Sequence, residues 1–354
     1  MKKRVSILLA LTMLATMFVG CADKKSEEST GGSSGGTSST SSNDDGGSKT
    51  IALCTEDLET EFWVAAHEAI VDTLEEQGIK VIETNCQGDA NKQLEQVKDV
   101  ITQDVDGIIV IPKDGDTAVA VTKEANNADI PIVIFNRPPT SDEGANITVV
   151  CDNATVAEAC VDYMVEEAEK KFDKTGEKLT PLIMVGDLGD PNAIARKEGF
   201  YTAIEKKPEI FNEAIEVPTE WDAATALANL QSAVQATPDV DFIFTSSDFL
   251  FPTIQSVLEP LGKWVKVGEE GHVIMGGLDG DATAGELIDE GMIEGTGVQD
   301  VYNEADLAIS GLLDAIEAGE TQPDEIREDP GFALTQGNLK EKRMDMWGNV
   351  IREQ

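Results

Sequence analysis

Short apolar runs alternate with amphipathic stretches along most of the chain. Runs rich in Ile and Val predict strands at 49–54, 80–86, 105–112, 130–136 and 147–153. Stretches with apolar residues at helical spacing lie between them, at 61–78, 90–103 and 116–129. Near-continuous Ile/Val strands separated by helices are typical of a parallel sheet that is covered on both faces.

The same alternation begins again after residue 153. Helices are predicted near 154–171, 191–207, 222–236, 250–262, 283–291 and 303–319, and strands at 179–187, 212–219, 240–248, 272–280 and 293–300. Two similar α/β modules therefore lie in tandem, as a repeat of architecture rather than of sequence. Ligands of open parallel sheets bind beyond the carboxyl ends of the strands, so two such sheets facing each other predict a cleft between those ends.

The N-terminal 48 residues do not follow this pattern. Lys2, Lys3 and Arg4 precede a short apolar segment, and Gly20 precedes Cys21. We predict a signal peptide over 1–20, and the small residue before Cys21 resembles a bacterial lipobox, which implies that Cys21 is lipidated. The alternative is an ordinary secretory signal followed by a chance cysteine. Residues 21–48 are rich in Ser and Gly and predict a flexible tether.

Composition excludes several classes of partner. The chain has 354 residues, enough for about two domains, and carries 67 Asp and Glu against 27 Lys and Arg, a net charge of −40. Such acidity argues against nucleic acid, against direct binding to an anionic membrane surface, and against a polyanionic ligand.

Metal and cofactor chemistry also lack their motifs. No CxxC is present, and Cys54, Cys86, Cys151 and Cys160 are predicted to be small buried apolar residues. The segment 170–180 lacks the alternating oxygen ligands of a calcium loop. We therefore predict no metal, no cofactor and no nucleophilic or phosphoryl-transfer site.

Candidate binding chemistry gathers where predicted strands end. The loop "VGDLGDPNAIARKEGF" leads from a strand into a helix whose first turns carry Asn192 and Arg196. A guanidinium offers paired donors that match adjacent hydroxyls, and a helix N-terminus adds backbone N–H groups. The alternative is that Arg196 is an exposed helix residue and that Asp190 or Asn192 only caps the helix.

Aromatic and amide side chains occupy similar positions. Phe62 and Trp63 follow the first strand, where aromatic faces could stack on the C–H faces of a sugar ring or, alternatively, fill the core. Asn136 and Arg137 close the fourth strand, and Asp279 ends a late one. These groups suit hydroxyl ligands, although strand ends capped by a neighbouring loop would have the same composition. Trp264 and Trp347 are assigned to packing.

Several motifs in order carry a family resemblance. "PIVIFNRPP", "GDLGDPNAIAR", "MGGLDGDATA" and "GTGVQD" lie between residue 50 and about 340. In this region the chain resembles the type I periplasmic sugar-binding proteins of ABC importers, the ribose- and galactose/glucose-binding group. The resemblance implies two Rossmann-like lobes with parallel sheets, joined by a three-strand hinge near 152–154, 298–300 and 326–331. It divides the chain into an N-terminal lobe of 49–153 plus 300–328 and a C-terminal lobe of 154–299 plus 329–354.

The resemblance also implies a ligand site. It directs Asn192 and Arg196 into the cleft and sets Trp221 opposite Trp63. Thr60, Asn192 and Ser247 depart from the side chains usual in relatives, so no particular sugar is implied. The predicted ligand contacts are Thr60, Phe62, Trp63, Asn136, Arg137, Asn192, Arg196, Trp221, Ser247, Asp279 and Gln299.

We therefore expect a lipid-anchored, extracytoplasmic, monomeric solute-binding protein rather than an enzyme. It would capture a monosaccharide and deliver it to an ABC permease, on the surface of a single-membrane (Gram-positive) envelope. Two alternatives stay open: a sensory binding protein that signals to a receptor kinase or chemoreceptor, and a secreted glycoside-active enzyme.

Overall fold

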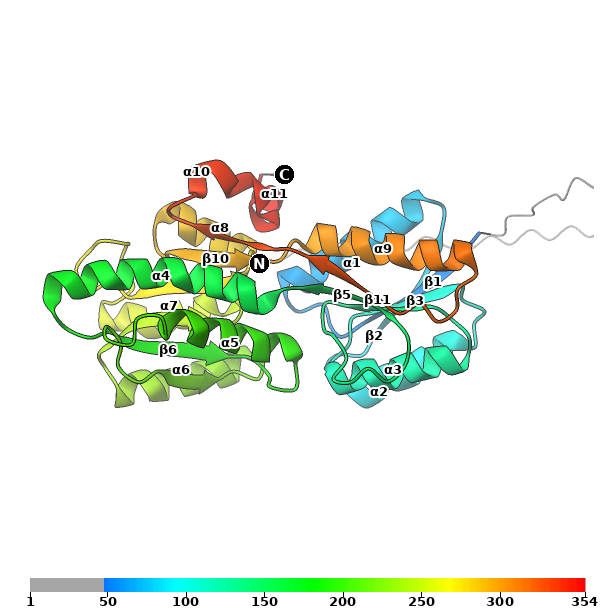
Figure 1. The fold of residues 1–354 in the computed structure, drawn as a ribbon, viewed down its shortest axis with the longest axis horizontal. Coiled ribbons are helices and arrows are strands. Elements are labelled where there is room, and N and C mark those ends of the chain that lie inside the picture. The colour runs from blue at the N-terminus through cyan, green and yellow to red at the C-terminus, as the bar shows by residue number, and fades with distance from the viewer. Residues whose placement is uncertain (1–47, 354) are drawn as a thin grey trace, which may run out of the picture. The chain divides into compact units, whose positions relative to one another are not determined.

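The computed structural model describes residues 48–353, which fold into two lobes (Figure 1). A parallel sheet of six strands forms the first lobe. The strand order is β11-β5-β4-β3-β1-β2, with every pair parallel. Its strands are β1 (Thr50–Thr55), β2 (Lys80–Asn85), β3 (Gly107–Val110), β4 (Ile132–Phe135), β5 (Ile147–Cys151) and β11 (Glu325–Asp329). The predicted signal peptide, Cys21 and the tether as far as residue 47 lie outside the described residues.

A second six-stranded sheet forms the second lobe, in the order β12-β10-β9-β8-β6-β7. Only β12 runs antiparallel to its neighbour, β10. The strands are β6 (Thr180–Val185), β7 (Ile215–Pro218), β8 (Val240–Thr245), β9 (Ile274–Asp279), β10 (Gly295–Val298) and β12 (Phe332–Thr335). β7 is shorter than the predicted strand 212–219 because it is a half-exposed edge strand that ends at Pro218.

Eleven α-helices accompany the strands of the described chain. They are α1 (Glu61–Glu76), α2 (Ala90–Ile101), α3 (Gly115–Asn127), α4 (Asn153–Thr175), α5 (Pro191–Ile204), α6 (Ala223–Ala236), α7 (Phe251–Leu258), α8 (Ala282–Glu290), α9 (Val301–Ala318), α10 (Leu339–Lys342) and α11 (Trp347–Arg352). Seven of them have an aspartate at the N-cap, and the carboxylate of this aspartate accepts a hydrogen bond from a backbone N–H of the first turn. None of these helices combines the length and the apolar character that crossing a bilayer requires.

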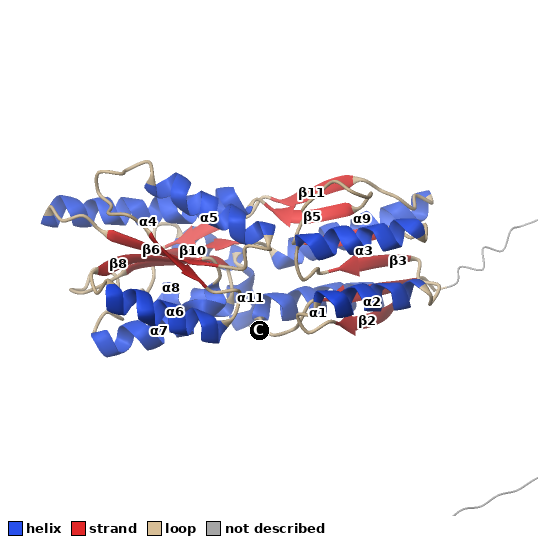
Figure 2. Ribbon diagram, turned by 90° about the horizontal axis from the view of Figure 1, so that it is seen from below, coloured by secondary structure: helices blue, strands red, loops and turns tan. Residues whose placement is uncertain are grey.

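Helices cover both faces of each sheet, as the continuous apolar strands predict (Figure 2). On the first sheet, α1 and α9 pack on one face while α2 and α3 pack on the other. On the second sheet, α4 and α5 lie opposite α6, α7 and α8. The central strands β3 and β4 are wholly buried and wholly apolar. Both faces of these strands are therefore core, which explains the absence of a polar–apolar alternation.

The chain passes between the two lobes three times: from β5 to α4, from β10 to α9, and from β11 to β12. These crossings match the predicted hinge, and the predicted fold of two α/β lobes with parallel-dominated sheets is confirmed. The four cysteines of the described chain are buried and free, as the sequence predicts. The sequence did not predict α10 and α11; α11 packs on α8, and α10 lies against β12.

Candidate ligand-binding cleft

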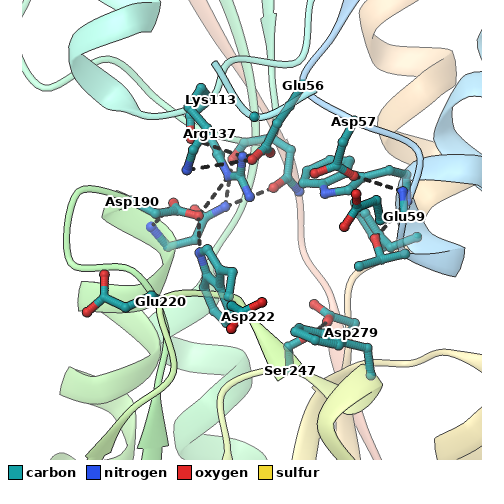
Figure 3. Close-up of a pocket in the computed structure, with 18 of the residues that line it drawn as sticks. Glu56, Asp57, Glu59, Lys113, Arg137, Asp190, Glu220, Asp222, Ser247 and Asp279 are labelled. Carbon is teal, nitrogen blue, oxygen red and sulfur yellow. Dashed lines mark hydrogen bonds and ion pairs between the residues drawn. The ribbon is translucent and has the colours of Figure 1, made fainter. Parts of the chain in front are cut away.

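A cavity of about 450 Å³ lies between the lobes, where β1, β4, β8 and β9 end (Figure 3). All eleven side chains that the sequence predicts as ligand contacts line this cavity. They are Thr60, Phe62, Trp63, Asn136, Arg137, Asn192, Arg196, Trp221, Ser247, Asp279 and Gln299. The volume suits a single small molecule, since small-molecule pockets start at about 300 Å³.

Two indoles approach the cavity from opposite lobes. Trp63 lies in the first turn of α1, where Thr60 Oγ1 accepts from its backbone N–H at 3.4 Å. Trp221 precedes α6, and its Nε1 donates to Asp190 at 3.1 Å. Each ring has a guanidinium over it: Arg137 at 5.0 Å from Trp63 and Arg196 at 5.7 Å from Trp221. These cation–π contacts orient both the rings and the charged groups.

Arg196 and Asp279 form a buried ion pair in the second lobe. The shortest N–O distance is 3.0 Å, and Arg196 also donates from Nε to Asn153 at 2.7 Å and from Nη1 to the Ser246 carbonyl at 2.6 Å. Its Nη2 has no partner among residues 48–353, so two donor hydrogens remain for a ligand. The expected cleft role of Arg196 thus agrees with its place in the fold, whereas the alternative of an exposed helix residue does not: only 4% of Arg196 is exposed.

The carboxylate of Asp279 is held from several sides. Ser247 Oγ donates to one oxygen, and Gln299 Nε2 donates to the other at 2.9 Å. Burial raises the pKa of Asp279, while Arg196, Ser247 and Gln299 act to lower it. Burial also raises the pKa of the neighbouring Asp281 to about 7 and that of Asp248 well above its ordinary value. Carboxyl groups therefore crowd the end of β9, directly behind the cavity wall.

Asn136 connects the lobes through its amide. Its Nδ2 donates to Gln299 Oε1 at 3.0 Å and to Glu304 Oε2 at 2.9 Å, and its Oδ1 accepts from Asn192 Nδ2 at 2.8 Å. Both amide hydrogens are therefore used within the protein, which leaves only acceptor capacity for a ligand. Glu304 is a fully buried residue that the sequence analysis missed, because a glutamate in the first turn of a helix usually indicates only a favourable helix start.

A second ion-pair network bridges the lobes at Arg137. Its Nε donates to Asp190 of the second lobe at 2.7 Å, and its Nη1 donates to Glu56 of the first. Lys113 lies 3.7 Å from Glu56 and 3.4 Å from Asp187. The sequence analysis considered Asp190 only as a helix cap and did not single out Lys113. An aspartate that caps a helix and an aspartate that forms an ion pair between lobes look the same in the sequence, so the sequence could not distinguish these roles.

The lining of the cavity is acidic. It contains seven carboxylates, those of Glu56, Asp57, Glu59, Asp190, Glu220, Asp222 and Asp279, against the three cations Lys113, Arg137 and Arg196. Each of the three cations is ion-paired to a lining carboxylate. Asp57, Glu59, Glu220 and Asp222 have no basic partner within residues 48–353. This charge distribution disfavours an anionic ligand.

One group of side chains in the described chain has the spacing of metal ligands: Cys151, Glu304 and Asp329, all of them buried. Glu304 is the member of this group that accepts from Asn136. Both oxygens of Asp329 accept hydrogen bonds within the protein, from Asp300 N–H and Asn303 Nδ2, each at 2.9 Å. Burial raises the pKa of Glu304 to about 8, with Asp329 adding to the rise. A protonated Glu304 accounts for the proximity of the two acids without a cation.

Comparison with known proteins gives the chain its family. Residues 51–321 match the sequence family described as "Periplasmic binding protein domain". The ribose import binding protein of Escherichia coli (strain K12) is 25% identical over 247 residues, which cover 70% of this chain and 78% of that protein. The D-apiose import binding protein of Actinobacillus succinogenes is 24% identical over 276 residues, covering 78% and 84%.

Solved structures share the fold. An ABC transporter solute binding protein from Bacillus halodurans with bound myo-inositol superposes with a TM-score of 0.73 at 23% identity, over 85% of this chain and 99% of that one. Since the family match spans well over half of the chain and the two-lobed architecture is the same, this chain belongs to the periplasmic binding protein family.

Proposed function

We propose that this protein captures one neutral monosaccharide or cyclic polyol in the cleft and delivers it to an ABC permease. The observation that supports this most directly is the lining of the cavity, where indoles, guanidinium groups and a buried carboxylate converge from both lobes. Indole faces bind the apolar faces of sugar rings, and charged groups bind hydroxyls through strong hydrogen bonds. The names of relatives, which specify ribose and D-apiose, agree with this ligand class.

All eleven predicted contacts are proposed as the ligand-binding set, with distinct roles. Trp63 and Trp221 stack on the ring, while Arg196 and Asp279 bind hydroxyls from the second lobe. Asn136, Asn192 and Gln299 orient these groups. The acidic lining argues for a neutral ligand, because a sugar phosphate or a sugar acid would meet unneutralised carboxylates.

We propose further that the protein has no catalytic turnover. A glycosidase needs one carboxyl group that holds a proton and a second that stays ionised beside the scissile bond. Here the three buried carboxylates of the lining, Glu56, Asp190 and Asp279, are each bound to a guanidinium, and the relatives named above are binding proteins. Hydrolysis of a panel of oligosaccharides by the purified protein would overturn this proposal.

The remaining expectations concern location and mobility. We propose that Cys21 carries a lipid anchor, that the protein acts as a monomer on a Gram-positive cell surface, and that 49–153 with 300–328 moves against 154–299 with 329–354. Closure over the ligand would form the surface that the permease recognises. A Cys21→Ala variant should leave the membrane fraction for the medium, and a variant that stays on the membrane would contradict the anchor.

Ligand identity can be tested by thermal unfolding against monosaccharides, polyols, nucleosides and sugar phosphates. We expect a neutral sugar or polyol to raise Tm, since a ligand at a hundred times its Kd adds about 2.7 kcal/mol to the free energy of unfolding. Arg196→Ala and Asp279→Asn should abolish the rise. Lys197→Ala is the matched control, because Lys197 forms only a surface ion pair with Glu216. A rise produced only by nucleosides or phosphates would contradict the proposed ligand class.

A further inference from the structure

The C-terminal segment Met346–Arg352 lies directly behind the binding cavity. It falls beyond residues 51–321, which the family match covers, and none of its side chains lines the cavity. Its first turn nevertheless contacts the backbone of the loop Asp279–Ala282, which follows β9 and carries the buried carboxylate of the site. The segment contacts both lobes: Asp279 in the second and Phe62 in the first.

Trp347 is the central residue of this contact. Its ring is almost fully buried, at 1% exposure, and its Nε1 donates to the Asp279 carbonyl at 2.9 Å. Asp279 has a φ of +134°, a region that residues with a side chain rarely adopt. Such a conformation persists only where the surroundings hold it, so the indole N–H supports the backbone geometry that aims the Asp279 carboxylate.

Gly348 brings the segment within backbone distance of the same loop. Its N–H donates to the Gly280 carbonyl at 3.1 Å. A Cβ at this position would lie 2.2 Å from the carbonyl carbon of Asp281 and 2.5 Å from Ala282 N, so no other residue type fits. Arg343 and Arg352 both bind Asp289 of α8, at 2.8 and 2.9 Å. The segment is therefore fixed to the second lobe by Arg352 at its C-terminal end and by Arg343 shortly before its first residue.

Trp347 also contacts the first lobe. Its ring lies edge-on to Phe62, with 5.9 Å between centroids, and Phe62 in turn lies edge-on to Trp63 at 5.0 Å. Beside them, Glu61 accepts from Ala282 N–H at the start of α8, at 2.8 Å. A continuous row of aromatic rings thus leads from the ligand-facing Trp63 to the carbonyl of Asp279 in the other lobe. These contacts join the two lobes beside the cavity.

We propose that Trp347 is a positioning residue for ligand binding. It holds the loop Asp279–Ala282 in the conformation that binds the ligand, and its contact with Phe62 stabilises the closed cleft. The inference rests on the proposed function, since it assigns the C-terminal segment to the same site. Its physical basis is that an N–H donor and an aromatic edge on one buried ring link two cavity walls that belong to different lobes.

The test compares Trp347→Phe with Trp264→Phe, once the wild-type protein has been titrated with the sugar found in the thermal panel. Trp347→Phe keeps the aromatic contact but loses the N–H donor, and we expect Kd at 20 °C to rise about tenfold, the cost of one lost hydrogen bond. Trp264 is a partly buried packing residue outside the cavity lining, and its variant should keep the wild-type Kd. An unchanged Kd for Trp347→Phe would overturn the inference while leaving the proposed function intact. A wild-type protein that binds nothing would overturn both.

Two further readouts separate positioning from a general loss of stability. If Trp347 acts through Asp279, the rise in Kd of the double variant Trp347→Phe/Ser247→Ala should be smaller than the product of the two single rises. The reason is that Ser247 orients the same carboxylate. Fully multiplicative losses would contradict the mechanism. Hydrogen exchange of the wild-type protein covers the case in which Trp347→Phe does not fold. We expect the amides of 346–352 to exchange about tenfold more slowly with sugar bound, and unchanged rates would overturn the inference.

Discussion

At the scale of residues, the site is one connected polar network. Glu304 binds Asn136, Asn136 binds Gln299, Gln299 binds Asp279, and Asp279 binds Arg196. Each buried polar group in this series depends on the next, because an unsatisfied partner would cost the full penalty of desolvation. The network therefore fixes the directions of the ligand-facing groups before a ligand arrives, which lowers the entropic cost of binding.

Glu304 should make stability depend on pH. Burial raises its pKa from 4.5 to about 8, so over this range the folded chain holds a proton that the unfolded chain has lost. The free energy of unfolding therefore falls as pH rises from about 4.5 to about 8. Glu304→Gln lacks this proton, and its stability relative to wild type should improve by about 3–4 kcal/mol between pH 5 and pH 8. Urea unfolding across this range measures the difference.

The matched control for this experiment is Glu68→Gln, an exposed glutamate of α1. A plot of its free energy of unfolding against pH should run parallel to that of the wild-type protein. If the plot for Glu304→Gln is also parallel to that of the wild-type protein, Glu304 is ionised in the folded protein, which would contradict the assignment of a protonated side chain.

At the scale of elements, α5 presents the second lobe's contribution to the cleft. It carries Asn192 and Arg196 on its buried face and packs closely on α4. The approach of the two helices depends on Gly199, where a Cβ would lie 2.3 Å from the Ala154 carbonyl oxygen. The position of Arg196 in the cavity is therefore set by the distance between α4 and α5.

Gly199→Ala should test this dependence. The added methyl group forces α5 away from α4, and overpacking of this kind costs about 1–3 kcal/mol, more than the gain in helix propensity of up to about 1 kcal/mol. We expect a lower midpoint of urea unfolding together with weaker sugar binding by titration calorimetry. Ile194→Ala, on the exposed face of the same helix, should change neither. Wild-type affinity in Gly199→Ala would show that α5 does not set the position of Arg196.

At the scale of the whole molecule, contacts between the lobes favour the closed cleft. Arg137 binds Asp190, Lys113 binds Asp187, Asn192 binds Asn136 and Glu61 binds the start of α8. A ligand can shift the balance toward closure only by its greater affinity for the closed form. The bridges between the lobes set how far that balance already lies toward closure without a ligand.

Asp190→Asn should open the ligand-free protein. The substitution removes the charge that Arg137 binds between the lobes, while the shape of the side chain is kept. We expect a longer distance between spin labels placed on α2 and α6, restored by saturating sugar at an increased Kd. Asp187→Asn is the control, because Asp187 and its partner Lys113 are both partly exposed, so its effect should be smaller. An unchanged distance in Asp190→Asn would contradict the role of this bridge.

Much of this arrangement could be predicted from the sequence. Continuous Ile/Val strands and amphipathic helices are local patterns, and they predicted both parallel sheets because a buried strand must be apolar on both faces. Strand ends were equally informative, since parallel strands deliver their carboxyl ends to one edge. For this reason Asn136 and Asp279, chosen at strand ends, line one cavity, and Arg196, which the family resemblance directed into the cleft, lines it too.

The partners of these residues could not be predicted in the same way. Glu304, Asp190 and Trp347 read as an ordinary helix residue, a helix cap and a packing residue, because their local sequence is the same in either role. Each gains its place in the site from a contact with a residue at least 31 positions away in the chain. The sequence by itself determined the lobes and the ends of the strands that face the cleft. Only the tertiary structure decided which buried charges neutralise one another and which wall the C-terminal segment supports, because burial and pairing depend on distances that the local pattern does not encode.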